Sequence, residues 1–187
     1  MRQLRCKDLE ARKRTVILGL VFLTCLGLAY VENTFFFRHL TNVFSNLLVA
    51  VSVIFVHNVL VVSLITLGMT FYTEFVYNFM KNRKIEYVVV QHPSLFALIF
   101  TIMIIGISIL RASTLVHGQV FLNALPLIVM LSAPNGIVEG YSIFQSIEKT
   151  LQRRISKRDL AVIYSLLFVA AVIEVSLTQI IFLAVLT

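Results

Sequence analysis

Two glutamates interrupt the apolar runs of this sequence, and carboxylates in such runs are groups from which ion or proton sites are built. Glu174 lies within the run Ala170–Thr178, about 21 Å along a helix that starts at Leu160. Thr178 follows one helical turn later and shares its face. Because a charged group at membrane depth is costly, Glu174 indicates an ion or proton site, a buried partner for another helix, or a protonated carboxyl bonded to a neighbouring group.

Glu139 is the second interruption, a few residues after Pro134. The proline lacks a backbone donor, which predicts a broken helix with free carbonyl groups beside Asn135. A broken helix at membrane depth is tolerated where it lines a cavity or is buried in protein, so a substrate or ion site is one interpretation. Gly136 and Gly140 form a small-xxx-small pair, so close helix packing is the other.

His57 and Asn58 form a polar pair inside another apolar segment. A single histidine there is more often a hydrogen-bonded core residue than a metal ligand. Metal binding needs further ligands at suitable spacing, and the other histidines are scattered along the chain: His39, His92 and His117. An acid–base group with Glu139 and Glu174 would require distant helices to bring these side chains together.

Catalytic signatures are missing from the sequence. It contains no G-x-S-x-G, H-E-x-x-H or glycine-rich phosphate loop, and its 7 glycines are spread over the whole chain. We therefore expect a protein that is not an enzyme, with no catalytic residues, no cofactor and no metal site.

The composition is that of a membrane protein. Of 187 residues, 59% are hydrophobic and only 13% are charged, with a mean hydropathy of +0.93. A soluble domain cannot cover its surface with so little charge. The net charge of +7 would suit nucleic acid, but in a membrane protein an excess of Lys and Arg reports orientation and anionic lipid. Nucleic acid is not an expected partner.

The elements that must position these polar groups are five apolar segments separated by short polar stretches. They predict an all-α, polytopic membrane helix bundle of about five spans, in which the second and fourth helices are bent or broken. Residues 1–14 form a basic cytoplasmic tail, and residues 15–187 form the transmembrane helical domain. The expected spans are about Thr15–Val31, Val43–Met80, Pro93–Leu110, Val120–Gln145 and Leu160–Leu186.

The distribution of Lys and Arg predicts the orientation of a multi-pass protein in the cell membrane. Two of these residues, Arg38 and Arg111, fall on one side, and all the others fall on the opposite side. This places the amino terminus in the cytoplasm and the carboxyl terminus outside. The cytoplasmic set is Arg2, Arg5, Lys7, Arg12, Lys13, Arg14, Lys81, Arg83, Lys84, Lys149, Arg153, Arg154, Lys157 and Arg158.

Two further sets of residues predict contacts with surrounding molecules. Basic residues beside the last span should attract anionic headgroups by about 1 kcal/mol each; they are Arg153, Arg154, Lys157 and Arg158. Small residues should allow helices to pack closely, within this chain or between copies; they are Gly136, Gly140, Ala170 and Ala171. We expect the lipid bilayer, other membrane subunits or a homo-oligomer as partners.

Three motifs from Asn42 to the end of the chain resemble the stage II sporulation protein M family of integral membrane proteins. The first is Ile54–Val59, which contains the His-Asn pair, followed by Leu67-Gly68 and then Asn78. The second is the turn Ala133–Glu139, where family members typically have Pro-His-Gly and this chain has Asn135 at the histidine position. The third is Ala170–Glu174 in the closing helix.

The resemblance implies a membrane anchor or accessory subunit more than one particular chemistry. The family's namesake holds together a cell-wall-degrading machine during spore formation, and some relatives accompany transporter components. The first hypothesis for function is therefore a non-enzymatic scaffold or accessory subunit of a membrane complex. The second is a small transporter or channel with an ion or solute path near Glu139 and Glu174.

Overall fold

The computed structural model describes the backbone of residues 2–43, 46–80, 89–117 and 125–186. Side chains are described mainly within 10–32, 46–80, 89–109 and 132–180. Within these ranges the chain is mostly helical and contains no β-strand. The long helices are α1 (Arg2–Val43), α2 (Leu47–Phe79), α4 (Pro93–His117), α5 (Leu125–Leu151) and α6 (Lys157–Leu186).

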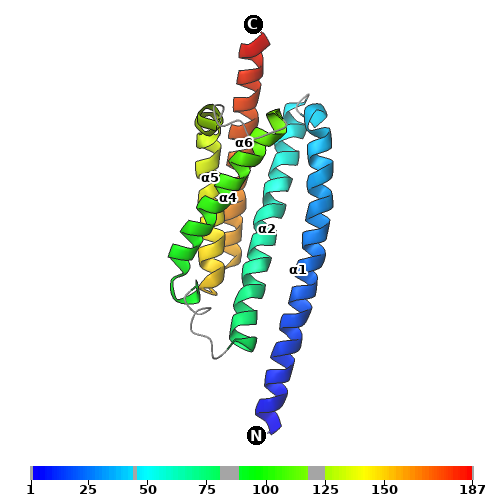
Figure 1. Ribbon diagram of the computed structural model, residues 1–187, viewed down its shortest axis with the longest axis vertical. Helices are drawn as coiled ribbons and strands as arrows, with labels where there is room; N and C mark the ends of the chain where they lie inside the picture. Colours follow the sequence, from blue (N-terminus) through cyan, green and yellow to red (C-terminus); the bar gives the residue numbers. More distant parts are fainter. Residues whose placement is uncertain (1, 44–45, 81–88, 118–124, 187) are drawn as a thin grey trace.

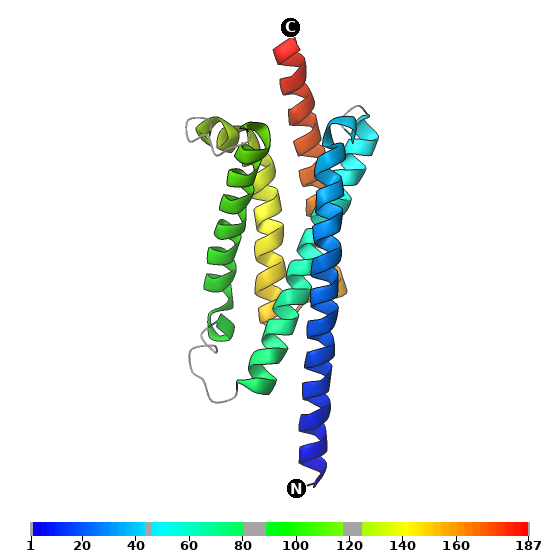
Figure 2. The same cartoon turned by 45° about the vertical axis from the view of Figure 1, so that its right-hand side comes forward.

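These helices lie alongside one another, and the two termini lie at opposite ends of the bundle (Figure 1 and Figure 2). Helix α2 packs against α5 and α6, and α5 packs against both α4 and α6. Helix α1 packs mainly against α2, so it lies at the edge of the bundle. The basic residues of the amino-terminal segment belong to α1, which is helical from Arg2.

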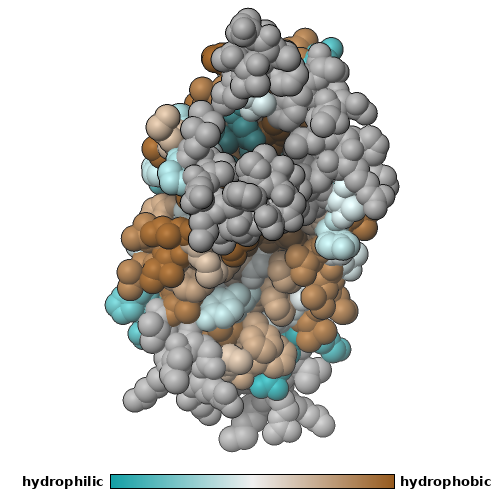
Figure 3. Space-filling model, turned by 45° about the horizontal axis from the view of Figure 1, so that its top comes forward, coloured by the Kyte–Doolittle hydropathy of each residue, from teal (hydrophilic) through white to brown (hydrophobic). Residues whose placement is uncertain are grey.

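Three helices are long and apolar enough to cross a membrane: Glu10–Glu32 within α1, Leu47–Phe79 and Lys157–Ile180. The helical membrane-protein class is confirmed to that extent. The apolar stretch Pro93–Ile109 of α4 is shorter within the described residues. Apolar residues also make up much of the described surface visible in Figure 3, as expected for helices that face lipid.

The fourth segment, expected to be bent or broken, is not broken into two helices at Pro134. Helix α5 continues through Pro134 as one element of 27 residues, and it ends later than the segment that hydropathy suggested. Proline removes only the hydrogen bond to the carbonyl of Met130, one turn earlier. Helix α5 packs against α2, α4 and α6. Helix α2 is likewise one helix, of 33 residues.

Local sequence explains the helix ends around the α5–α6 turn. The amides of Arg153 and Arg154 donate to the carbonyls of Thr150 and Lys149, which is the Schellman pattern. Arg153 holds φ at 55°, a conformation usually left to glycine. Helix α6 then begins with a capping box, in which Ser156 and Asp159 exchange hydrogen bonds. The sequence Gln152–Ser156 therefore forces a short reversal and an antiparallel α5–α6 pair.

The core lies where α2, α5 and α6 meet, with α4 added on the far side of α5. The main cluster consists of Val62, Met69, Ala97, Ile143, Ile147, Leu151, Ile163 and Leu167. A smaller second cluster packs α2 against α6 through Ala50, Ile54, Ala171 and Val175. The main cluster therefore packs the carboxyl-terminal part of α5 against α2 and α6, and the second cluster extends the contact between α2 and α6.

Candidate intramembrane carboxylate site

A small cavity lies between α4, α5 and α6, and three of the polar residues singled out in the sequence line it. Its volume is about 180 Å³. Asn135 and Glu139 come from α5 and Glu174 comes from α6, while Ser108 and Ser132 add hydroxyl groups from α4 and α5. The structure therefore brings together Asn135 and Glu174, which are 39 residues apart in the chain.

Asn135 connects the two acidic helices. Its Nδ2 donates a hydrogen bond of 3.0 Å to Oε2 of Glu174. The Asn135 side chain is 8% exposed, yet its Oδ1 has no hydrogen-bond partner among the described residues. A buried carbonyl oxygen without a donor is unfavourable, so the cavity has an open place for a group that donates a hydrogen bond or carries positive charge.

Glu139 lies one helical turn beyond Asn135, close enough to Glu174 for the two carboxylates to interact electrostatically. None of the ion pairs formed by the described side chains includes either glutamate. Two neighbouring carboxylates in a low-dielectric region repel one another when both are ionised. The pair therefore needs a proton or a bound cation in the cavity. The side chain of Arg111, further along α4, lies outside the described residues.

The α5–α6 pairing explains why Asn135 and Glu174 meet. Counted along the chain, Asn135 lies as far before the turn at Arg154-Ile155 as Glu174 lies after it. In an antiparallel helical hairpin, residues equally far from the turn lie at the same depth. Asn135 and Glu139 are one helical turn apart and share one face of α5. This counting rule was the signal in the sequence that could have predicted the pairing.

Three other residues of the predicted polar site lie elsewhere. Thr178 is exposed, and its hydroxyl donates to the backbone carbonyl of Glu174 over 2.8 Å, away from the carboxylate. Asn58 is 6% exposed, and its Nδ2 has no partner among the described residues. Asn58 does not line the carboxylate cavity. It lies on the α2 face between Ile54 and Val62, which packs against α5 and α6.

His57 forms a separate polar pair with Glu32, a residue that the sequence analysis did not single out. Its Nδ1 lies 3.2 Å from both carboxylate oxygens of Glu32, between α2 and α1. Glu32 and His57 are also equally far along the chain from the point where α1 gives way to α2, so the same counting rule applies to this helix pair. The structure thus does not join His57 to Glu139 and Glu174 in an acid–base group.

The small residues predicted for helix packing have different environments. A Cβ on Gly140 would lie 2.7 Å from Cδ1 of Ile105, so α4 and α5 approach closely there. A Cβ on Gly136 would meet nothing within 4 Å. Ala170 and Ala171 are completely buried, and Ala171 belongs to the contact between α2 and α6.

The basic residues near the start of α6 also differ from one another. Arg153 donates to Oε1 of Glu74 over 2.9 Å, and its guanidinium lies 4.2 Å from the ring centre of Tyr77. Glu74 in turn accepts from Asn78, which also donates to Thr15 of α1. A polar network at this end therefore connects α1, α2 and the α5–α6 turn. The remaining three predicted lipid contacts are exposed: Arg154, Lys157 and Arg158.

The described residues contain no cluster of three or more His, Cys, Asp or Glu side chains arranged to hold a metal ion. The basic stretch with Lys81, Arg83 and Lys84 lies outside the described residues. No protein-family model, no curated protein and no solved structure matches this chain. The chemistry of the carboxylate site itself is therefore the main guide to function.

Proposed function

We propose that this protein is a small multi-pass membrane transporter or channel that binds a proton or monovalent cation between Glu139 and Glu174. One observation carries the proposal, which is the meeting of both carboxylates and Asn135 in one cavity within an apolar helix bundle. Intramembrane carboxylates that face a bundle interior commonly mark ion pathways and proton relays. The unpartnered Oδ1 of Asn135 adds an oxygen that a cation can use.

In this proposal all five long helices cross the membrane, with the amino terminus in the cytoplasm. The positions of the termini at opposite ends of the bundle support an odd number of crossings (Figure 2). Helices α4 and α5 have 25 and 27 residues, and a span needs about 20. The unequal distribution of Lys and Arg supports the orientation. Glu139 and Glu174 then lie inside the hydrocarbon layer.

The test is cation flux into liposomes that contain the purified protein. A potassium diffusion potential drives uptake, and an enclosed pH dye or sodium dye reports which cation moves. We expect flux above that of protein-free liposomes, and we expect Glu139→Gln and Glu174→Gln each to abolish most of it. Gln keeps the size and hydrogen-bonding capacity of the side chain but removes its charge.

The matched control is Glu32→Gln, the same change in the separate Glu32–His57 pair between α1 and α2. Flux through this variant should stay near that of the unaltered protein. If protein-containing and protein-free liposomes take up both cations equally, the transport proposal fails. If all three variants lose flux to the same degree, the path does not run through the carboxylate cavity.

A second candidate is the scaffold or accessory subunit that the resemblance to the stage II sporulation protein M family implies. Helix α1 favours it, because α1 packs mainly against α2 and leaves large apolar side chains uncovered, among them Ile17 at 60% and Leu28 at 65% exposure. Such a surface suits a neighbouring membrane subunit. Two motifs behind the resemblance, Ala133–Glu139 and Ala170–Glu174, contribute residues to the same cavity.

Purification of the tagged chain in mild detergent, followed by native mass measurement, separates the two candidates. A defined hetero-complex with partners in fixed stoichiometry supports the scaffold function. A chain that always purifies alone, or only with copies of itself, contradicts it.

A further inference from the structure

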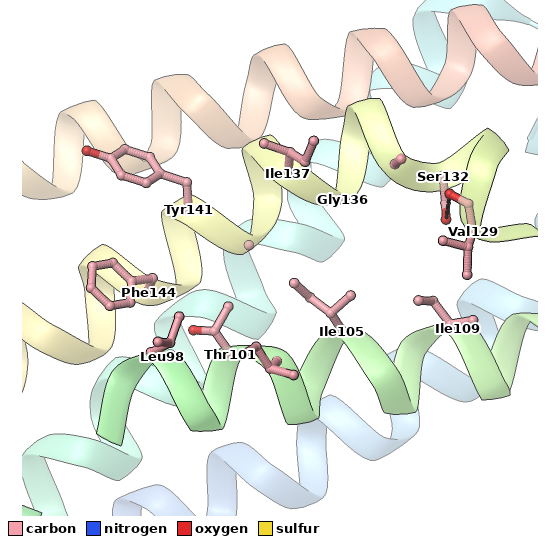
Figure 4. A pocket seen from close by; sticks show the side chains of 13 residues that line it. Leu98, Thr101, Ile105, Ile109, Val129, Ser132, Gly136, Ile137, Tyr141 and Phe144 are labelled. Atoms are coloured by element: carbon pink, nitrogen blue, oxygen red, sulfur yellow. Dashed lines mark hydrogen bonds between the residues drawn. The ribbon is translucent and has the colours of Figure 1, made fainter. Parts of the chain in front are cut away.

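A second and larger cavity lies on the outer side of the α4–α5 pair, next to the carboxylate cavity. It is a groove of about 460 Å³ with walls that are almost entirely apolar. Figure 4 shows Ile105 and Ile109 on α4 facing α5, and Gly136 exposing bare backbone on the α5 side. Leu98, Ile102 and Ile137 at its edges are each at least half exposed. The groove, called the α4–α5 groove below, therefore opens toward the lipid.

The α4–α5 groove and the carboxylate cavity have four lining residues in common: Ile105, Ile109, Ser132 and Gly136. The two spaces are therefore neighbours along one stretch of the α4–α5 interface. At Gly136 nothing lies within 4 Å of the position that a Cβ would take. In contrast, Ile105 closes the interface against Gly140, one turn further along α5.

Two buried polar atoms without hydrogen-bond partners lie along this stretch. One is Oδ1 of Asn135, on the carboxylate cavity, and the other is Oγ1 of Thr101, on the groove. Both side chains are more than nine-tenths buried, with 8% and 6% exposure. Such atoms normally have a partner, and neither finds one among the described residues. The carboxylates beside Asn135 are acceptors that favour a positively charged donor.

We propose that the α4–α5 groove and the carboxylate cavity together bind an amphiphilic amine that enters from the membrane, with its apolar chain in the groove and its ammonium group at Asn135, Glu139 and Glu174. The inference depends on the proposed function, since it names the kind of cation that the carboxylate site accepts. The ammonium group supplies three donors and one positive charge. These match two carboxylates and the free Oδ1 of Asn135.

Charge complementarity selects the amine over other amphiphiles of the same length. A fatty acid would bring a third carboxylate to Glu139 and Glu174, which is unfavourable in a low-dielectric cavity. An alcohol has one donor and no charge, so it gains only the apolar contact that an amine also gains. The apolar chain of the amine contributes to the binding free energy through the apolar surface that it buries in the groove.

The experiment is photolabelling of the intact protein in nanodiscs with a dodecylamine that carries a diazirine in its chain. Mass spectrometry of the fragments locates the labelled residues. We expect label on the parts of α4 and α5 that line the groove, with unlabelled dodecylamine competing at least about tenfold better than dodecanol. A charge-assisted hydrogen bond accounts for a difference of that size.

Two kinds of variant test the two halves of the site. Gly136→Leu should fill the groove and abolish labelling, whereas Gly27→Leu makes the same exchange on α1, at a position that is also open, and should label normally. Glu139→Gln and Glu174→Gln should make dodecylamine and dodecanol compete equally. The comparison of the two competitors on the unaltered protein does not depend on any variant folding.

Equal competition by dodecylamine and dodecanol on the unaltered protein overturns the proposal and identifies the groove as a site for lipid chains. A dimer that blocks labelling and dissociates in Gly136→Leu also overturns it, because a second copy then fills the groove. Cation flux that depends on Glu139 and Glu174, without specific amine labelling, refutes this inference alone. Specific labelling without flux refutes transport and leaves the binding site in place.

Discussion

Asn135 on α5 donates a hydrogen bond of 3.0 Å to the carboxylate of Glu174 on α6. This is the direct polar link between the two acidic helices at the cavity. It positions one carboxylate oxygen, and it leaves the Oδ1 of Asn135 available to a bound group. The same bond therefore contributes both to the stability of the helix pair and to the chemistry of the cavity.

Asn135→Leu should lower the free energy of unfolding by about 1–3 kcal/mol, because Glu174 then loses its donor inside the bundle. Glu174→Leu should also be destabilising. The double variant should lose clearly less than the sum, since replacing both partners leaves no unpaired group. Unfolding in mixed micelles measures all three. Thr178→Val, on the exposed face, is the control and should change stability little; additive losses would show that the bond does not matter.

Gly140→Ala should destabilise the α4–α5 contact by about 1–3 kcal/mol through overpacking, because the new Cβ would lie 2.7 Å from Cδ1 of Ile105. Ile105→Val removes that methyl group and should restore part of the loss in the double variant. Gly106→Ala adds a Cβ on α4 where nothing lies within 4 Å. It should be neutral or slightly stabilising. Thermal unfolding of the unaltered protein and the four variants checks the order, and a failure of Ile105→Val to rescue Gly140→Ala would contradict this packing.

The Arg153→Gly variant should be more stable than the Arg153→Ala variant by about 1 kcal/mol. Alanine, like arginine, has a Cβ that disfavours the positive φ required at position 153, whereas glycine has none. Both variants lose the ion pair with Glu74 and the contact with Tyr77. That ion pair is half exposed and contributes no more than about 1 kcal/mol. The comparison therefore isolates the backbone conformation. Equal stabilities in chemical unfolding would argue against a costly conformation at this turn.

Neutralising Arg154, Lys157 and Arg158 together should weaken the retention of anionic lipid, at about 1 kcal/mol per residue. Arg153→Gln alone should have a much smaller effect, because its guanidinium already contacts Glu74 and Tyr77. Native mass spectrometry can count the anionic and zwitterionic lipids bound to each variant. A loss from Arg153→Gln as large as that from the triple variant would show that the arginine leaves Glu74 to bind lipid.

The helical class and the polar residues of the site could be predicted from hydropathy, because charge is costly inside apolar helices. The helix ends could not, since hydropathy does not detect caps. Helix α5 ends at Leu151 and helix α6 begins at Lys157, because residues of the turn between them form hydrogen bonds with the free backbone groups at these two helix ends. Pro134 does not break α5, because the contacts of α5 with α4 and α6 hold the helix together despite one missing hydrogen bond.

The pairings within the site required knowledge of which helices are neighbours. Asn135 and Glu174 meet because a short turn makes α5 and α6 antiparallel, and Glu32 and His57 meet by the same rule in α1 and α2. Counting residues from a turn does not predict how α4 is positioned against α5. The stretch before α5 lies outside the described residues, and the contact depends on side-chain fit, as between Ile105 and Gly140.

The edge position of α1 has a consequence for cooperativity. Since α1 packs mainly against α2 and α4 packs mainly against α5, while α2, α5 and α6 all contact one another, the bundle consists of a mutually supported core of three helices with α1 and α4 attached to it. The least stable unit of such a protein separates first. When the chain is pulled from its amino-terminal end, α1 should leave as a separate extraction step at low force, before the core of α2, α5 and α6 gives way.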